Sequence, residues 1–392
     1  MQIAIVGAGA MGLQVAEELL ASATEIELLA IDASQDSLSK FEDALANDKV
    51  KLAVKDATNI ESLAAALQGS DVVVNAAQYN VNGLVMKAAL KARTHYVDLG
   101  GMFHETRRQL KLHGEFHSAG LTAVVGMGAA PGITNVLAAH ACAELEQVDS
   151  VEASFGASVE DLQDGSEFVP PYSLRTIMQE FLEESVQFLD GSHHSQPPMS
   201  GARVISFPRP IGELDCIYTL HSEPATLPSF LASKGVRNVV WRLGLPPALT
   251  GAIRAFASAG LGASEPIEYH GVEIVPVDFL LASIEANQRK SDAKNLPYTE
   301  TGCLRVEVNG VTTSHEQRTV VVTCQRSITG VAPDMAGVIT GVPCAIAALM
   351  LADGRANNPG VHAPEAAIPT SMMFEELGNR GFALSSKTFP SI

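Results

Sequence analysis

Short apolar runs alternate with segments of helical spacing over the first third of the chain. The runs have the length of buried strands, and segments such as 59–67 and 81–92 carry apolar residues three or four positions apart. The predicted strands are 3–6, 26–31, 51–54, 72–75, 95–99 and 122–125. Such alternation is typical of right-handed crossovers in a parallel, doubly wound sheet, which binds ligands at the carboxyl ends of its strands.

The pattern changes between about residues 151 and 327. Predicted strands at 151–157, 217–221, 236–242, 271–277, 302–308 and 319–324 are separated by hairpin-like loops and longer helical pieces. Asn309-Gly310 has the signature of a type I′ hairpin turn, and the polar segment 191–201, which holds His193 and His194, predicts a surface loop. This region therefore predicts an α+β domain with an open antiparallel or mixed sheet.

An alanine- and glycine-rich helix follows residue 330, and Pro343 predicts a kink in it. We expect this helix to pack back on the first domain and residues 364–384 to form a closing tail. The predicted organisation is a Rossmann dinucleotide-binding domain at 1–130, a substrate and dimerisation domain at 131–329, and a returning C-terminal part at 330–392.

A glycine-rich turn joins the first predicted strand to the first predicted helix. Gly7 permits the tight turn, Gly9 lets a pyrophosphate approach the backbone, and Gly12 lets the helix pack close to the strand. Ala10 and Met11 open the helix, whose free N–H groups and positive dipole end favour phosphate. The strand before and the helix after the turn support a dinucleotide site over a plain tight turn.

Two aspartates follow the next two strands. Asp32 ends the second strand, where a carboxylate accepts the ribose hydroxyls of NAD and repels a 2′-phosphate. No arginine follows in Ala33-Ser34-Gln35, so the sequence favours NAD over NADP, although a helix N-cap is the alternative for Asp32. Asp56 could accept a hydrogen bond from the adenine amino group or cap a loop.

Polar and small residues follow the later strands, at the edge where the cofactor must lie. The predicted cofactor-binding residues there are Asn75, Ala76, Ala77, Gly100 and Asn135. We expect Tyr79 to point toward the nicotinamide end of the cofactor; the alternative is that its ring only packs against neighbouring side chains. Asp98 could pair with a substrate ammonium or take its proton, with a helix N-cap as its alternative.

The second domain adds weaker candidates. His221, at the end of a predicted strand, could serve as an acid or base, or could be a structural histidine. Arg175 and Arg242 are candidates for holding a substrate carboxylate. The histidines do not have metal-ligand spacing on one helix, so we predict no metal site.

Composition and charge limit the classes of partner that the protein can bind. The formal net charge of −18 argues against nucleic acid and anionic membranes, and the 46% hydrophobic content suits a sizeable core. The first strand starts at once, without a charged leader, and the apolar stretch 334–351 is interrupted by Gly337, Gly341 and Pro343. Five scattered cysteines fit small buried hydrophobes in a reducing compartment. We therefore expect a cytoplasmic protein that binds a small molecule.

Several of these motifs together resemble the saccharopine dehydrogenase-like family, and within it most closely the lysine 6-dehydrogenase group. The resemblance is carried by 7–12, Asp32, 73–76, 97–101 and 130–135, and by weaker matches at Tyr172-Ser173-Leu174, after Thr329 and in 364–381. The sequence departs from the family pattern at Trp241-Arg242-Leu243-Gly244. The arginine there is displaced by one residue, so its side chain turns to the other face of the strand. Arg175 also stands where the lysine enzymes tend to have an acidic residue.

The resemblance implies a Rossmann domain with a substrate and dimerisation domain, and NAD(P)-dependent oxidation of a carbon–nitrogen bond. It implies that Asp98 steers or deprotonates the amine, that Tyr79 and Asn135 line the site, and that Ser173 lies near the substrate. We expect a homodimer or larger homo-oligomer. Two alternatives stay open: reductive joining of an amine to an aldehyde or keto acid, and a dinucleotide-sensing module without turnover.

Overall fold

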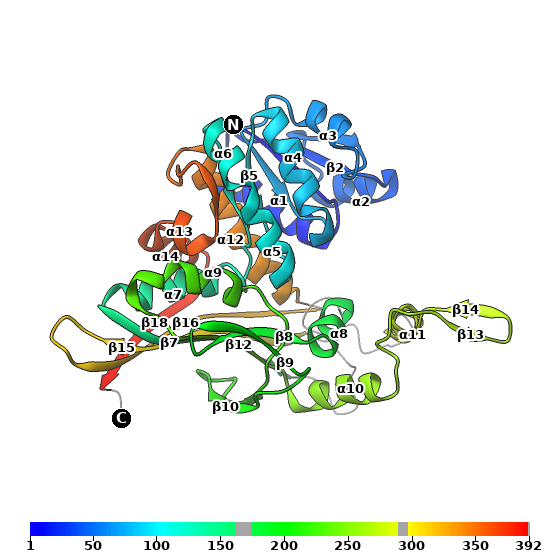
Figure 1. Ribbon diagram of the computed structural model, residues 1–392. Coiled ribbons are helices and arrows are strands. Elements are labelled where there is room, and N and C mark those ends of the chain that lie inside the picture. The colour runs from blue at the N-terminus through cyan, green and yellow to red at the C-terminus, as the bar shows by residue number, and fades with distance from the viewer. Residues whose placement is uncertain (162–173, 289–296, 332, 391–392) are drawn as a thin grey trace.

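The fold consists of two sheets with a layer of helices between them (Figure 1). A computed structural model describes residues 1–161, 174–288, 297–331 and 333–390. The upper body in Figure 1 holds the N-terminal sheet, and the lower body is built on a second, broader sheet. This α/β architecture, a doubly wound domain plus an α+β domain, confirms the fold class expected from the sequence.

The first sheet is parallel throughout, in the order β17-β6-β5-β4-β1-β2-β3. Its strands are β1 (Gln2–Val6), β2 (Glu27–Asp32), β3 (Val50–Val54), β4 (Val72–Asn75), β5 (His95–Asp98), β6 (Thr122–Val124) and β17 (Gly360–His362). Their connections are α1 (Ala10–Ser22), α2 (Gln35–Leu45), α3 (Ile60–Leu67), α4 (Asn82–Ala92), α5 (Phe103–Gln109) and α6 (His113–Ala119). The chain leaves β1 toward β2 on one side and reaches β4 on the other, so the strand order reverses beside the glycine-rich turn.

The strand β17 was not predicted. It is only three residues long, lies some 235 residues after its neighbour β6 in the chain, and pairs Gly360 with Thr122. A run this short carries no period that sequence analysis can read. The segment nevertheless returns to the first domain, as expected for this part of the chain.

The second sheet is mixed, in the order β18-β16-β15-β7-β12-β8-β9. Its strands are β7 (Gln147–Glu160), β8 (Ser185–Leu189), β9 (Ser192–Gln196), β12 (Asn238–Gly244), β15 (Tyr298–Val311), β16 (Gln317–Gly330) and β18 (Ala383–Pro390). Strands β7 and β12 are parallel, while the other pairs are antiparallel. The sheet is open at β18 and β9, in agreement with the open mixed sheet predicted for this region.

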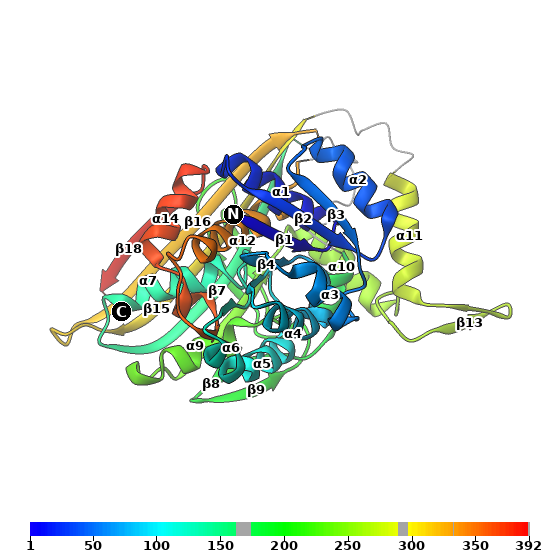
Figure 2. The same ribbon diagram turned by 90° about the horizontal axis from the view of Figure 1, so that it is seen from above.

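Helices on the upper face of this sheet connect it to the first domain (Figures 1 and 2). They are α7 (Ile133–Ala143), α9 (Glu223–Phe230), α12 (Met335–Ala352), α13 (Pro364–Ala367) and α14 (Thr370–Asn379). Toward the other end of the sheet lie α8 (Leu174–Leu182), α10 (Pro247–Ser258), α11 (Pro276–Gln288) and the hairpin β13 (Ile267–Tyr269)–β14 (Val272–Ile274). The hairpin β10 (Arg203–Ser206)–β11 (Glu213–Cys216) lies below the sheet in Figure 1. The cysteines are free and buried, as predicted.

Three predictions for the second domain are wrong in detail. Asn309 and Gly310 lie inside β15 at a bulge, and the turn to β16 is at 312–316, because Leu145 and Gln147 pack closely around Gly310. Residues 217–221 form no strand beyond a bridge from Ile217 to Leu243. The polar segment 191–201 contains β9, which is polar because it is the exposed edge strand.

Helix α12 corrects the interpretation of the apolar stretch 334–351, which Gly337, Gly341 and Pro343 were expected to interrupt as a possible membrane span; the kink at Pro343 stays a prediction. The helix runs unbroken from Met335 to Ala352 and is long and apolar enough to cross a membrane by length and composition alone. Within the protein, 78% of that stretch is buried, and Gly341 lies against Gln14 of α1. The small residues thus allow close packing on the first domain, as predicted, whereas β18 corrects the picture of the tail by pairing with β16 of the second sheet.

Candidate active site

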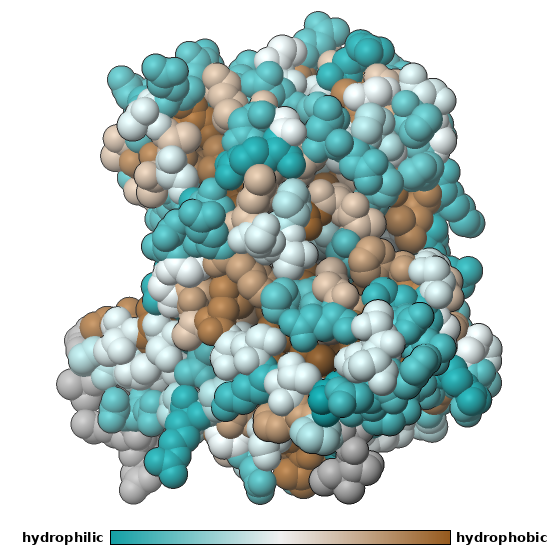
Figure 3. All heavy atoms as spheres, turned by 90° about the vertical axis from the view of Figure 1, so that its left-hand side faces the viewer, coloured by the Kyte–Doolittle hydropathy of each residue, from teal (hydrophilic) through white to brown (hydrophobic). Residues whose placement is uncertain are grey.

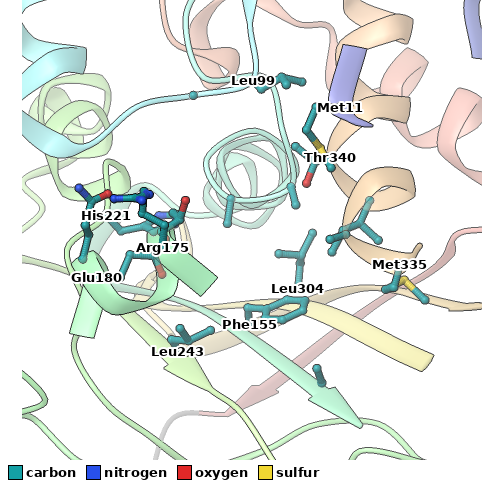
Figure 4. A pocket seen from close by; sticks show the side chains of 18 of the residues that line it. Met11, Leu99, Phe155, Arg175, Glu180, His221, Leu243, Leu304, Met335 and Thr340 are labelled. Atoms are coloured by element: carbon teal, nitrogen blue, oxygen red, sulfur yellow. The ribbon is translucent and has the colours of Figure 1, made fainter. Parts of the chain in front are cut away.

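A cavity of about 800 Å³ lies between the two bodies, above the second sheet (Figure 4). The first domain contributes Met11 of α1 and the segments that follow β4, β5 and β6, and the second contributes β7, β12, β15 and α8, with α12 closing one side. The lining residues used below are Met11, Ala76, Ala77, Tyr79, Gly100, Phe155, Arg175, Glu180, His221, Trp241, Leu243 and Glu300. The side view in Figure 3 shows that the molecule is narrower between the two bodies and that hydrophobic residues lie on its surface there.

The glycine-rich turn has the geometry that the sequence predicted. A Cβ on Gly7, whose φ is +102°, would lie 2.7 Å from the amide nitrogen of Ala77, and one on Gly12 would lie 1.9 Å from the carbonyl oxygen of Gly7. A Cβ on Gly9 would meet no atom within 4 Å. Two glycines are therefore needed for packing, while the third leaves open space in front of the N-terminus of α1, where Ala10 is exposed.

The two aspartates after β2 and β3 have different surroundings. Asp32 reaches back to the turn, and its carboxylate accepts the N–H groups of Ala8 and Ser34, each at 2.8 Å. Asp56 is exposed and accepts the N–H (2.8 Å) and hydroxyl (2.7 Å) of Thr58, which lower its pKa. Asp32 thus stands beside the candidate phosphate site, while Asp56 forms the loop cap that was its alternative.

Two predicted cofactor contacts are buried away from the cavity. Asn75 is 1% exposed, and its amide donates to the side-chain oxygen of Asn82 at 2.8 Å. Asn135, also 1% exposed, accepts the N–H of Gly132 and donates to Glu365. Both amides are used within the protein, so the structure corrects their assignment and leaves Ala76, Ala77 and Gly100 as lining residues.

The predicted catalytic carboxylate, Asp98, is also corrected. It is 1% exposed and accepts four hydrogen bonds, from the N–H groups of Gly126 (2.6 Å) and Gly100 (2.9 Å), from Tyr96 (2.8 Å) and from Gln109 (2.5 Å). Burial raises its pKa, although these four donors favour the charged form. A carboxylate has about four acceptor positions, so Asp98 is engaged in holding the turns after β5 and β6.

We predict that Asp98→Asn lowers the free energy of unfolding by about 1–3 kcal/mol, because the amide NH₂ would face N–H donors in a buried site. Urea unfolding measures the effect, and Asp56→Asn, at an exposed loop, is the matched control. If Asp98→Asn were as stable as the wild-type protein but lost turnover, the original catalytic assignment would be restored.

His221 is the titratable group best placed in the cavity. Its side chain is 11% exposed and lies beside Glu180 in the cavity (Figure 4). Its ring stacks on Trp241 with centroids 4.0 Å apart at 15°, and its Nδ1 lies 2.5 Å from Glu223 Oε2. Burial alone would lower the pKa of His221, but the carboxylates of Glu223 and Glu180 raise it above its usual value. Nε2 remains as the ring nitrogen available to a ligand.

Only some of the other predicted substrate residues line the cavity. Tyr79 lines the cavity, where burial and Glu183 raise its pKa, and Arg175 lines it while forming an ion pair with Asp278. Arg242 is corrected as a candidate for holding a substrate carboxylate: it lies on the opposite face of β12 from Trp241 and Leu243, outside the cavity, and is bound to Glu152, Gly201 and Tyr218. Ser173 lies outside the described residues.

Sequence reasoning missed Glu223, Glu180 and Glu300. Glu180 and Glu300 line the cavity, and burial raises the pKa of Glu300, whose Oε2 accepts the N–H of Met335 at 3.4 Å. Glu223 stands two residues after His221, and that His-x-Glu spacing was the available signal. Among the residues that the structure describes, no group of three or more His, Cys, Asp or Glu side chains could hold a metal.

Comparison with known proteins covers nearly the whole chain. A family model described as the saccharopine dehydrogenase NADP binding domain matches residues 3–124, and one described as the saccharopine dehydrogenase C-terminal domain matches residues 128–382. The chain is 25% identical over 396 residues to a carboxyaminopropylagmatine dehydrogenase from Synechocystis, with 97% of this chain and 96% of that protein covered. It is 24% identical over 392 residues to a carboxynorspermidine synthase from Vibrio alginolyticus, covering 92% and 91%.

A solved structure has the same fold. Apo saccharopine dehydrogenase (L-Glu forming) from Saccharomyces cerevisiae superposes with a TM-score of 0.75 at 17% identity, covering 99% of both chains. The likeness extends over both sheets and the helices between them.

Proposed function

The chain belongs to the saccharopine dehydrogenase family, and on that premise we propose that it is an NAD-dependent oxidoreductase of a carbon–nitrogen bond in an amine or amino acid. The expected family and the enzyme class, an NAD(P)-dependent amine or amino-acid dehydrogenase, are thereby confirmed. The observation that carries the proposal is a single cavity that joins the strand ends beside the glycine-rich turn to His221.

The first domain fits a dinucleotide. Gly9 leaves space for a pyrophosphate at the N-terminus of α1, and Asp32 lies at the adjacent strand end, in reach of a ribose. The chemistry supplied by a bound nicotinamide is hydride transfer to or from the carbon that carries the nitrogen. Met11, Ala76 and Gly100 would border that end of the cofactor, since they line the cavity.

The second domain supplies the acid–base chemistry. In oxidation, the substrate ammonium gives a proton to Nε2 of His221, the carbon–nitrogen bond becomes a double bond as the hydride leaves, and added water then releases an amine and a carbonyl compound. Glu223 holds the imidazole through Nδ1. Trp241, Leu243 and Phe155 exclude bulk water from this end of the cavity.

The charges in the cavity favour a cationic substrate. Glu180 and Glu300 are carboxylates, and Arg175, which could meet a substrate carboxylate, is already paired with Asp278. The names of the relatives, a dehydrogenase and a synthase, support both reaction directions. Reductive joining of an amine to an aldehyde or keto acid is therefore the second candidate.

The test is nicotinamide absorbance in both directions. We expect reduction of NAD by one member of a panel of L-lysine, other diamino acids and diamines at alkaline pH, or oxidation of NADH by an amine mixed with an aldehyde or keto acid. Tight NADH binding with no turnover in either direction would contradict the proposal and favour a sensing module.

Cofactor choice is tested at Asp32. Asp32→Ala should weaken NAD binding by about 10- to 100-fold, as expected for loss of charged hydrogen bonds to the ribose, and weaken NADP far less. Titration of both dinucleotides measures this, and Asp32→Asn, which retains the side-chain shape, is the matched variant. Equal losses for NAD and NADP would rule out the ribose assignment.

A homodimer or larger oligomer and a cytoplasmic location stay predictions of the sequence, which left the identity of the amine or amino-acid substrate open. The β13–β14 hairpin projects from the body and exposes Ile267, Tyr269 and Val272, which is consistent with an oligomer (Figures 1 and 2).

A further inference from the structure

Two buried carboxylates meet at the first turn of α7, behind His221. Glu223 comes from α9 and is fully buried, and Glu365 comes from α13 and is 7% exposed. Neither residue was a candidate in the sequence, and Glu365 does not line the cavity. Their convergence joins the second domain, the C-terminal part and the helix that leads out of the first domain.

Neighbouring residues of α7 hold the two carboxylates. The Thr134 hydroxyl donates to Glu223 Oε1 at 2.8 Å, and Asn135 Nδ2 donates to Glu365 Oε2 at 2.8 Å. The N-terminal end of a helix favours negative charge, so this turn is a suitable place for an anion. It is less suitable for two, because buried like charges repel each other strongly.

The partners of the two carboxylates differ. Glu223 accepts the Thr134 hydroxyl and Nδ1 of His221, an ionisable donor that favours a charged acceptor. Glu365 accepts neutral donors such as the Asn135 amide, and among the described residues its Oε1 has no hydrogen-bond partner. Burial raises the pKa of Glu365, and the nearby Glu223 raises it further, while Thr226 and Asn135 oppose this. Glu365 is therefore the partner that keeps its proton.

We propose that Glu223 and Glu365 form a positioning pair that shares one negative charge, carried by Glu223, and that this charge holds His221 with Nδ1–H toward Glu223 and Nε2 toward the cavity. This inference rests on the proposed function in assigning His221 as the acid or base. Glu365 acts through Glu223, because a second charge at the turn would weaken the hold of α7 on both carboxylates.

Other groups also face His221 and must be controlled. Glu180 on α8 is a second carboxylate near the ring, and Arg175 on the same helix is ion-paired with Asp278. Trp241 covers one face of the imidazole and is uncharged. Glu180→Gln is therefore the matched control for loss of a nearby negative charge without a bond to Nδ1.

Trp241 offers a direct probe, because it is the only tryptophan in the sequence and it stacks on His221. A protonated imidazole accepts an electron from excited indole more readily than a neutral one, so it quenches the fluorescence. Fluorescence of the full-length free enzyme against pH thus follows protonation of His221 without cofactor or substrate. His221→Asn should abolish the transition.

The expected midpoint in the wild-type protein lies above the usual histidine pKa. Glu223→Gln should lower it by about one to three pH units, the effect of removing an opposite charge at this range. Glu365→Gln, whose neutral amide replaces a neutral acid, should leave it unchanged, and Glu180→Gln should lower it less than Glu223→Gln does.

Two results would overturn the proposal. If Glu223→Gln left the midpoint in place, Glu223 would not hold His221, and if Glu365→Gln shifted it as far as Glu223→Gln, Glu365 would carry charge. If Glu223→Gln fails to fold, Glu223→Asp is the second variant: it keeps the charge and should retain a raised midpoint, and a midpoint at or below the usual histidine value would count against the pair.

This experiment separates the pair from the proposed function. A titration as expected, together with no amine turnover in the absorbance assay, would leave the pair intact and remove the reaction. Amine turnover together with a fluorescence midpoint that Glu223→Gln does not shift would support the reaction and rule out the pair.

Discussion

Replacing His221 with asparagine should lower kcat/KM for the amine by about 10²- to 10⁴-fold, the usual contribution of a positioned acid or base. The reason is geometric: His221 is the cavity residue whose one ring nitrogen is held by a buried carboxylate while the other is available to a ligand. NAD affinity should change little, because the predicted dinucleotide contacts come from the first domain. Steady-state kinetics and an NAD titration measure the two quantities.

The control for that variant is His194→Asn. His194 lies exposed on the edge strand β9 and contacts Ser192, so its loss should leave kcat/KM near the wild-type value. If His221→Asn kept more than about a tenth of wild-type kcat/KM, a loss too small for a general acid or base, the assignment would be wrong.

Gly12→Ala should raise the Kd for NAD by about 100-fold or more and also lower protein stability, by the 1–3 kcal/mol or more that overpacking costs. Its Cβ would lie 1.9 Å from the carbonyl oxygen of Gly7, and backbone cannot yield as a flexible side chain does. Helix α1 would have to move away from β1, and with it the helix N-terminus that would hold the pyrophosphate. Calorimetric NAD titration and thermal unfolding measure the two effects.

Gly9→Ala separates binding from stability. Its backbone (φ −86°, ψ −168°) suits any residue, and a Cβ there meets no protein atom within 4 Å. The variant should therefore unfold like the wild type but bind NAD at least about tenfold more weakly, because the methyl group fills the space for the pyrophosphate. Gly114→Ala, in α6 with equally open surroundings, should alter neither, and normal NAD binding by Gly9→Ala would contradict the placement of the dinucleotide.

The dinucleotide-binding half was readable from the sequence because its signals are local. The strand–turn–helix context and the glycines depend on neighbours a few positions apart, and Asp32 is placed by the end of β2 alone. The alternation of a strand indicated that Arg242 faces away from Trp241 and Leu243, and this signal should have removed Arg242 from the substrate candidates.

The polar residues near the ends of the later strands were not readable in the same way. Asn75 and Asn135 were predicted to bind the cofactor and Asp98 to act in catalysis, but whether such a side chain meets solvent or buried donors and acceptors depends on packing from distant segments. Glu365 lies 230 residues from Asn135 and reaches it only through the fold. His221 was named from the end of a predicted strand that the structure does not form, and its partner Glu223 was overlooked.

The second sheet shows a similar limit. Asn309-Gly310 is a strong hairpin signal, but the long pairing of β15 with β7 and β16 continues through it and moves the turn to 312–316. A single local preference is small compared with two continuous ladders of hydrogen bonds. Long-range pairing likewise placed the polar β9 and the C-terminal β18 at the sheet edges.

The most direct test of the central claim, that this enzyme acts on a carbon–nitrogen bond, follows the transferred hydrogen. NADH carrying deuterium at both C4 positions would be incubated with the amine and carbonyl compound that react fastest in the absorbance assay, and the product examined by mass spectrometry and NMR. The account predicts one deuterium on the carbon joined to the new nitrogen. Deuterium on an alcohol carbon, or an unlabelled product, would contradict it.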